Sequence, residues 1–125
     1  TRRSSDLGTG APPDPAEIDW ARVRELKQEI GAEDFAEVVE LFLSETEAMI
    51  DALAGQDPGQ YEEALHSLKG AALNLGLAGL AALCFRGERL AAEGRAAEVQ
   101  VAPVLTAYAA ARAAFLSGIA EGRAG

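Results

Sequence analysis

Apolar residues recur every three or four positions through most of this 125-residue chain. This period is typical of amphipathic α-helices, and no stretch shows the two-residue alternation of a half-buried β-strand. Glycine and proline residues separate the apolar segments. The pattern predicts helices at about positions 15–30, 33–54, 58–75, 77–93 and 103–119.

The predicted helix boundaries rest on capping residues. Asp14 and Asp57 are each followed by proline, and a Glu or Gln stands three positions after the aspartate. Such an aspartate accepts hydrogen bonds from the first turn, and proline suits the first helical position because its missing N–H would have no partner there. We therefore expect Asp14 and Asp57 to be N-caps. By the same argument, the last helix should begin at Pro103.

Glycines end four of the predicted helices, at Gly31, Gly55, Gly76 and Gly94. Four long amphipathic helices joined by short connections predict an all-α fold. The expected architecture is an antiparallel up-down four-helix bundle, with a short additional N-terminal helix that covers one end.

Residues 14–120 therefore form one helical domain. Residues 1–13 contain few apolar groups and several Gly, Ser and Pro, so we expect a flexible linker or remnant there, and a flexible C-terminal tail at 121–125. We find no uninterrupted apolar run of membrane-spanning length and no signal-peptide pattern, so we expect neither a transmembrane span nor a leader.

The net charge of −9 argues against nucleic-acid binding, which requires clustered Lys and Arg. The charge is unevenly distributed: Glu29 to Leu68 contains many acidic residues and no Lys or Arg, whereas Lys69 to Arg95 is richer in basic than in acidic residues. Such a bias is consistent with a solvated helix face or with steering of an oppositely charged partner.

Cys84 is the single cysteine and His66 the single histidine of the chain. One cysteine excludes an internal disulfide and fits a reducing compartment, so we expect a cytoplasmic protein. Cys84 lies in an apolar helical segment, which indicates a buried structural thiol. A metal site is disfavoured because there is no second histidine.

His66 is the main candidate for chemistry. Helical rotation places it away from the apolar face of its helix, so it should face solvent. That apolar face comprises Tyr61, Ala64, Leu65, Leu68, Ala71, Ala72 and Leu75. The positions beside His66 on the outer face are Lys69, Gly70 and Leu73. A mid-helix glycine costs about 1 kcal/mol relative to alanine, so Gly70 indicates that space beside His66 matters. The outer face is therefore a candidate docking site around an imidazole.

The segment LHSLKGAALNLG, positions 65–76, resembles the signature of histidine-containing phosphotransfer (HPt) domains. In that family a His-x-x-Lys-Gly core is followed by a glycine ten residues after the histidine, and His66, Lys69, Gly70 and Gly76 match in type and spacing. A looser similarity extends over about positions 18–119.

One part of that similarity lies in the next helix. Cys84 and Glu88 fall where the family often has a Cys-x-x-Leu-Glu stretch. Gly87 stands in place of the leucine, and this departure should weaken helix packing there.

The resemblance implies that His66 accepts a phosphoryl group from the phosphoaspartate of a receiver domain and passes it to another receiver. The Mg²⁺ ion would belong to the receiver, and the chain itself would need no cofactor. Lys69 could offset the phosphate charge, or it could be a surface lysine paired with Glu62 or Glu63. No glycine loop for ATP binding occurs, so the chain would be a carrier and not an enzyme.

Two alternatives remain open. The chain could be the phosphorylated histidine domain of a chemotaxis-type histidine kinase, whose ATP-binding domain would be separate. It could also be a non-catalytic helical adaptor that uses the same exposed face. The expected partners are response-regulator receiver domains and possibly a histidine kinase, with neither nucleic acid nor membrane.

Overall fold

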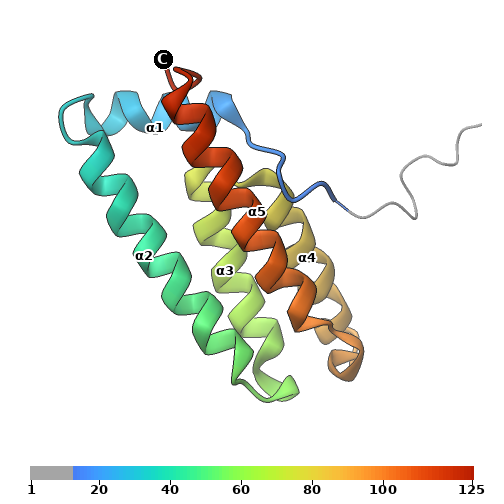
Figure 1. Cartoon of the computed structure of the whole chain (residues 1–125). Helices are drawn as coiled ribbons and strands as arrows, with labels where there is room; N and C mark the ends of the chain where they lie inside the picture. The colour runs from blue at the N-terminus through green and yellow to red at the C-terminus, as the bar shows by residue number, and fades with distance from the viewer. Residues whose placement is uncertain (1–12) are drawn as a thin grey trace, which may run out of the picture.

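A computed structural model describes residues 13–125 (Figure 1). Within this range the chain forms α-helices and two short 3₁₀ helices, and no strand. The elements are α1 (Trp20–Ile30), α2 (Phe35–Ala54), η1 (Pro58–Gln60), α3 (Tyr61–Leu75), α4 (Ala78–Ala92), η2 (Ala96–Glu98) and α5 (Val101–Ala120).

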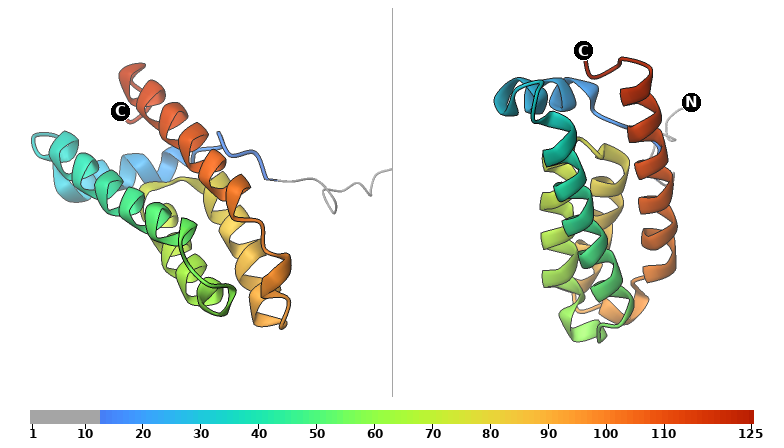
Figure 2. Two further views of the ribbon diagram at one scale, coloured as in Figure 1. Left: turned by 60° about the horizontal axis from the view of Figure 1, so that its bottom comes forward. Right: turned by 60° about the vertical axis from the view of Figure 1, so that its left-hand side comes forward.

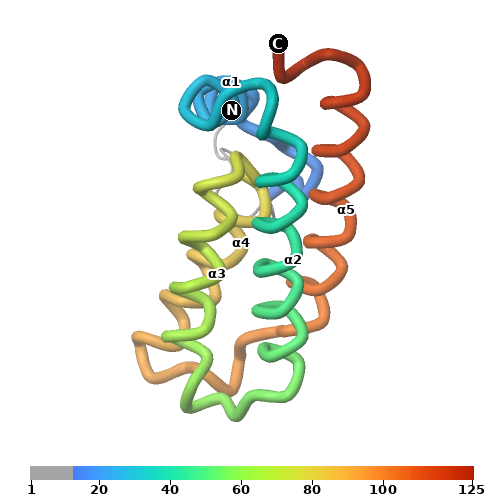
Figure 3. Tube along the Cα trace, turned by 90° about the vertical axis from the view of Figure 1, so that its left-hand side faces the viewer, coloured from blue at the N-terminus to red at the C-terminus, as the bar shows by residue number. Residues whose placement is uncertain are grey.

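The four long helices α2 to α5 run side by side and alternate in direction along the chain (Figures 1 and 2). Helix α1 crosses one end of this bundle, next to the turn between α3 and α4 and close to the C-terminus (Figure 3). This arrangement confirms the expected antiparallel bundle with a short additional N-terminal helix.

The core contains one apolar stripe from each helix. Its largest fully buried side chains are Phe115, Leu53, Leu65, Leu68, Leu75, Leu77 and Leu80. Burying one such side chain contributes about 1.5–3 kcal/mol, so these contacts dominate the stability of the bundle. Thr46 is buried as well, and its hydroxyl donates a hydrogen bond to the carbonyl of Phe42 at 2.8 Å.

The first helix begins later than predicted. Asp14 does not cap it: the Asp14 carboxylate accepts from the Ala16 N–H at 3.0 Å and closes a turn. The N-cap is Asp19, whose side chain accepts from the Arg22 N–H. The segment before α1 instead lies against the start of α4, where the Gly79 N–H donates to the carbonyl of Glu17 at 3.1 Å.

Two other helix starts also differ. Asp57 makes no side-chain capping bond, and Pro58–Gln60 forms a 3₁₀ turn before α3 begins at Tyr61. Helix α5 begins at Val101, which places Pro103 at its third residue. Proline is compatible with that position because the N–H groups of the first turn have no partner within the helix.

Helix α5 is long and apolar enough to cross a membrane by length and composition alone. No transmembrane span was expected there, because Thr106, Arg112 and Ser117 interrupt the apolar residues of this segment. In the structure, one side of α5 packs in the bundle core through Val104, Ala107, Tyr108, Ala111 and Phe115.

The C-terminal residues 121–125 do not extend into solvent as the expected flexible tail would. Ala124 is buried, and the Lys27 ammonium donates to the carbonyl of Gly125 at 2.7 Å. The chain end is thus folded back against α1. The linker predicted at 1–13 lies outside the described residues except for Pro13.

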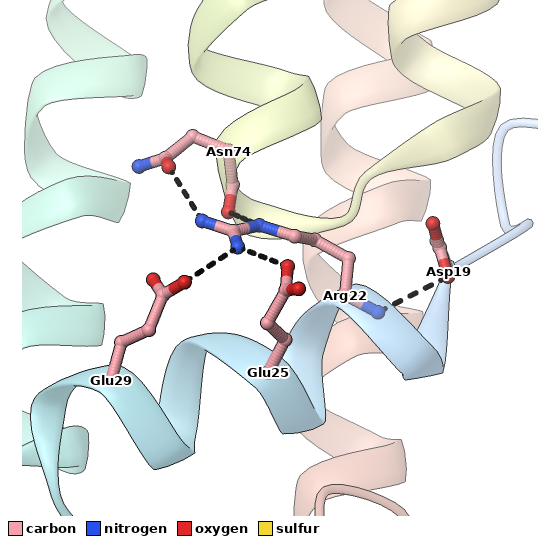
Figure 4. Close-up of polar contacts among 5 residues, drawn as sticks. All are labelled: Asp19, Arg22, Glu25, Glu29 and Asn74. Carbon is pink, nitrogen blue, oxygen red and sulfur yellow. Dashed lines mark hydrogen bonds and ion pairs between the residues drawn. The ribbon is translucent and has the colours of Figure 1, made fainter.

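The turn between α3 and α4 is held by polar contacts with α1 (Figure 4). The Arg22 guanidinium donates to the carbonyl of Asn74 at 3.0 Å and to its side-chain oxygen at 2.9 Å. Gly76 ends α3 with φ of 84°, and its carbonyl accepts from the Asp19 N–H at 2.7 Å. A side chain at Gly76 would also meet the Asp19 carbonyl at 2.9 Å. These contacts fix where α3 ends and hence where its outer face lies.

Candidate functional site

The outer face of α3 has the orientation that the sequence predicts. Leu65, Leu68, Ala72 and Leu75 are buried, and Tyr61, Ala64 and Ala71 are half-buried. The His66 side chain is 68% exposed. Its imidazole is therefore accessible from solvent, as predicted from the position of His66 opposite the apolar face.

Glu88 of α4 lies next to this imidazole. Its Oε2 atom is 2.7 Å from Nδ1 of His66, within hydrogen-bond distance. The Glu88 side chain is only 18% exposed, so it lies in the crevice between the two helices. The sequence places Glu88 in a family-like motif, but it does not indicate this contact.

Lys69 makes the second contact to Glu88. Its Nζ atom is 2.8 Å from Oε1. Among the described residues, Lys69 therefore pairs with a residue of α4 and not with Glu62 or Glu63. The Lys69 ammonium lowers the pKa of Glu88 below its usual range. Burial opposes this effect, and a weaker hydrogen bond with His66 adds to it. Glu88 is thus an anion at neutral pH.

This pairing determines which imidazole nitrogen is free. A carboxylate only accepts hydrogen bonds, so the Nδ1 atom of His66 must carry the proton that it donates to Glu88. In the neutral ring, Nε2 then has the lone pair. The geometry thus presents an exposed imidazole with a free lone pair on Nε2, and the contact with Glu88 sets its tautomer.

Gly70 and Leu73 lie on the same exposed face of α3. A Cβ atom built on Gly70 would meet nothing within 4 Å, so the glycine leaves open space on the surface. Leu73 is a large hydrophobic residue that is 54% exposed. Gly76 does not contact this face; its role is to end α3.

Gly87 has a different effect from the one predicted. A Cβ atom at this position would lie 2.8 Å from Cδ1 of Leu65 and 3.6 Å from Cγ1 of Val99. The glycine therefore allows α4 to lie close against α3 beside His66. The absence of a side chain does not weaken packing there but brings Glu88 near the imidazole.

Cys84 is the buried thiol that the sequence predicts. Burial, reinforced by the nearby Glu88 charge, raises the pKa of its thiol to about 12. A thiol with such a pKa remains protonated and is a poor nucleophile. Within residues 13–125, no group of three or more His, Cys, Asp or Glu side chains could hold a metal ion.

Phe85 is an exposed aromatic residue that was not among the candidates predicted from the sequence. It lies on α4, three positions before Glu88, and its ring is 5.1 Å from Nζ of Lys69. The signal that could have identified it is its position next to Cys84: if Cys84 faces the core, the following residue points away from it.

The fold and this site define a helical-bundle protein with one accessible histidine paired with a carboxylate. Residues 37–118 match the family model of the Hpt domain, which is more than half of the chain, and the chain belongs to this family. Hpt domains are phosphocarrier modules in phosphorelays, where they interact with receiver domains and histidine kinases. No curated protein and no solved structure matches the chain significantly.

Proposed function

We propose that this protein accepts a phosphoryl group on Nε2 of His66 from the phosphoaspartate of a receiver domain and passes it to another receiver. The observation that carries this proposal is the contact of 2.7 Å between Nδ1 of His66 and Glu88, which leaves Nε2 exposed with its lone pair. Membership of the Hpt family supplies the class of reaction.

The transfer requires no general base on this chain. Nε2 attacks the phosphorus atom, the N–P bond forms, and the bond between phosphorus and the aspartyl oxygen breaks, which leaves a carboxylate on the receiver. Nδ1 keeps its proton, so the phosphorylated ring is cationic, and the adjacent Glu88 carboxylate stabilises that charge. Transfer to a second receiver reverses these steps. Phosphoryl transfer depends mainly on in-line positioning and charge stabilisation, which suits so small a site.

Lys69 supports the site through charge. Its ammonium lies against Glu88 in the unphosphorylated protein, close enough to the outer face to reduce the repulsion of an incoming phosphoryl group. We expect Lys69→Ala to slow transfer without abolishing it, because Lys69 does not form the bond to phosphorus. The Mg²⁺ ion that assists the transfer would be bound by the receiver.

As a carrier, this chain does not phosphorylate itself from ATP. Phosphorylation from ATP would require a separate kinase domain, as in a chemotaxis-type histidine kinase. We place the protein in the cytoplasm, in keeping with its single, buried cysteine. Its partners are receivers and possibly a kinase, not nucleic acid or a membrane.

The test is labelling by a receiver domain. The purified protein should acquire an acid-labile, alkali-stable phosphate from a phosphorylated receiver with Mg²⁺, and no phosphate from ATP alone. His66→Gln should abolish labelling without loss of helicity or thermal stability, because the side chain is exposed. Labelling of the His66→Gln variant would place the acceptor elsewhere. If a kinase domain with ATP labels the wild type and no receiver does, the protein is the kinase-associated domain; if neither labels it, it is an adaptor.

A further inference from the structure

A shallow hollow of about 400 Å³ lies between α3 and α4. It is lined by Lys69, Leu73, Ala78, Ala81, Ala82 and Phe85. Lys69 belongs both to this hollow and to the His66 site, so the two are continuous. A partner that contacts both His66 and Lys69 therefore also reaches the edge of the hollow.

The hollow borders two of the large hydrophobic side chains that are exposed among the described residues. Phe85 is 46% exposed and Leu73 is 54% exposed. Exposed apolar surface of this kind is typical of protein-interaction sites when several such side chains gather in one place. Here Leu73 is seven positions from His66 on α3, and Phe85 is three positions from Glu88 on α4.

Two cations lie within cation–π distance of the Phe85 ring. Nζ of Lys69 is 5.1 Å from the ring centroid, and Cζ of Arg89 is 5.8 Å from it. The closest carboxylate to Arg89 is that of Glu93, at 3.6 Å, and both side chains are largely exposed. Because such an exposed pair is weak, Arg89 can exchange Glu93 for an acidic group of a partner.

We propose that Phe85 and Arg89 select which receiver domains exchange phosphoryl groups with this protein. An apolar side chain of the receiver fills the hollow against Phe85 and Leu73, and an acidic side chain beside it pairs with Arg89. This inference rests on the proposed function and extends it to the choice of partner. A receiver with a basic residue at the apolar position would bring that charge against Lys69 and Arg89, and would be rejected.

The occupant is a receiver because of the position of the hollow. The proposed donor must bring its phosphoaspartate to His66, so its surface next to that aspartate faces α3 and α4. The apolar patch and the two cations on this protein are complementary to a receiver surface that is apolar in the centre and acidic at the edge. Protein interfaces commonly have such an apolar core and a polar rim.

The experiment compares two phosphoryl donors. Phosphoramidate is a small donor that needs no docking surface. The receiver domains of the panel, phosphorylated with acetyl phosphate, must dock before they can transfer the phosphoryl group. Phe85→Ala and Arg89→Glu should be labelled by phosphoramidate within twofold of the wild type. With the receiver that serves the wild type best, kcat/KM should fall tenfold or more, mainly through KM, and the order of preference within the panel should change.

Leu41→Ala is the matched control, because Leu41 is 54% exposed but lies on α2. Its transfer from every receiver should stay within twofold of the wild type, and circular dichroism should show all variants to be folded. If Phe85→Ala and the wild type accept phosphoryl groups equally well from every receiver, Phe85 does not select receivers, and that part of the proposal is overturned. An equal loss with both donors would show that Phe85 acts on the His66 chemistry and not on docking. Failure of every receiver to label the wild type would overturn the proposed function itself.

Discussion

Nδ1 of His66 and Oε2 of Glu88 are 2.7 Å apart although the two residues are 22 positions apart in the chain. One lies on α3 and the other on α4, so the contact depends on how these helices pack. Gly87 lets α4 lie against Leu65 at this level. The state of the imidazole is thereby linked to the packing of the bundle.

Glu88→Gln should release the tautomer of His66. An amide can donate as well as accept, so it does not require the proton on Nδ1. We expect ¹⁵N NMR to show one tautomer in the wild type and a mixture in the variant, and transfer from a receiver to slow by about tenfold, which corresponds to about 1.4 kcal/mol of barrier. Glu62→Gln, an exposed change on α3, should alter neither property. An unchanged tautomer in Glu88→Gln would show that Glu88 does not orient the ring.

Glu88 should also make stability depend on pH in the acidic range. Its pKa is lowered in the folded protein, chiefly by Lys69, so the folded state favours the charged form. The stabilisation is present above the ordinary glutamate pKa of about 4.3. It is lost as pH falls through the lower pKa of the folded state. Urea unfolding should therefore show that the free energy of unfolding falls less between pH 7 and pH 3 for Glu88→Gln than for the wild type. The same loss in both proteins would contradict this linkage.

Substitutions at Gly70 can test whether the open space beside His66 is needed for docking without disturbing the fold. Since nothing lies within 4 Å of its added Cβ, Gly70→Ala should raise the free energy of unfolding by about 1 kcal/mol through helix propensity. Gly70→Gln should be similarly well folded, but its longer side chain should block transfer from receivers, whereas the alanine variant should keep most of it. Thermal denaturation and receiver labelling measure the two effects. Normal transfer by Gly70→Gln would show that this space is not used in docking.

Cys84 should be unreactive while the protein is folded. Its thiol is buried and has a pKa of about 12, so little thiolate forms at pH 8. A thiol reagent such as dithionitrobenzoate should react slowly with the native protein and completely in urea. Ser67→Cys, which places a second thiol on the exposed face of α3, should add one rapidly reacting group. Rapid reaction of native wild-type protein would mean that α4 opens locally.

Most of the helices and the outward direction of His66 could be predicted from sequence because both depend on residues within a turn or two of one another. The apolar period assigns a buried face, and His66 falls opposite to it. Glycine stops are equally local: Gly31, Gly76 and Gly94 have positive φ values, which only glycine adopts freely.

The helix starts were harder to predict because local signals compete. Asp14 and Asp19 both offer a capping carboxylate, and Asp19 prevails while the chain around Asp14 packs at the start of α4. Gly79 has no room for a Cβ, which would lie on the Asp14 carbonyl. Such a contact joins segments far apart in the chain, so no local pattern indicates it.

By itself, the sequence determined that this chain forms a helical bundle with one exposed histidine in an HPt-like motif. Only the tertiary structure decided that Glu88 pairs with both His66 and Lys69, and that Phe85 and Leu73 border one hollow. The physical reason is that helix formation is governed by the nearest turns, whereas the register of α3 against α4 is set by packing over their whole length. The chemistry of the imidazole follows from that register.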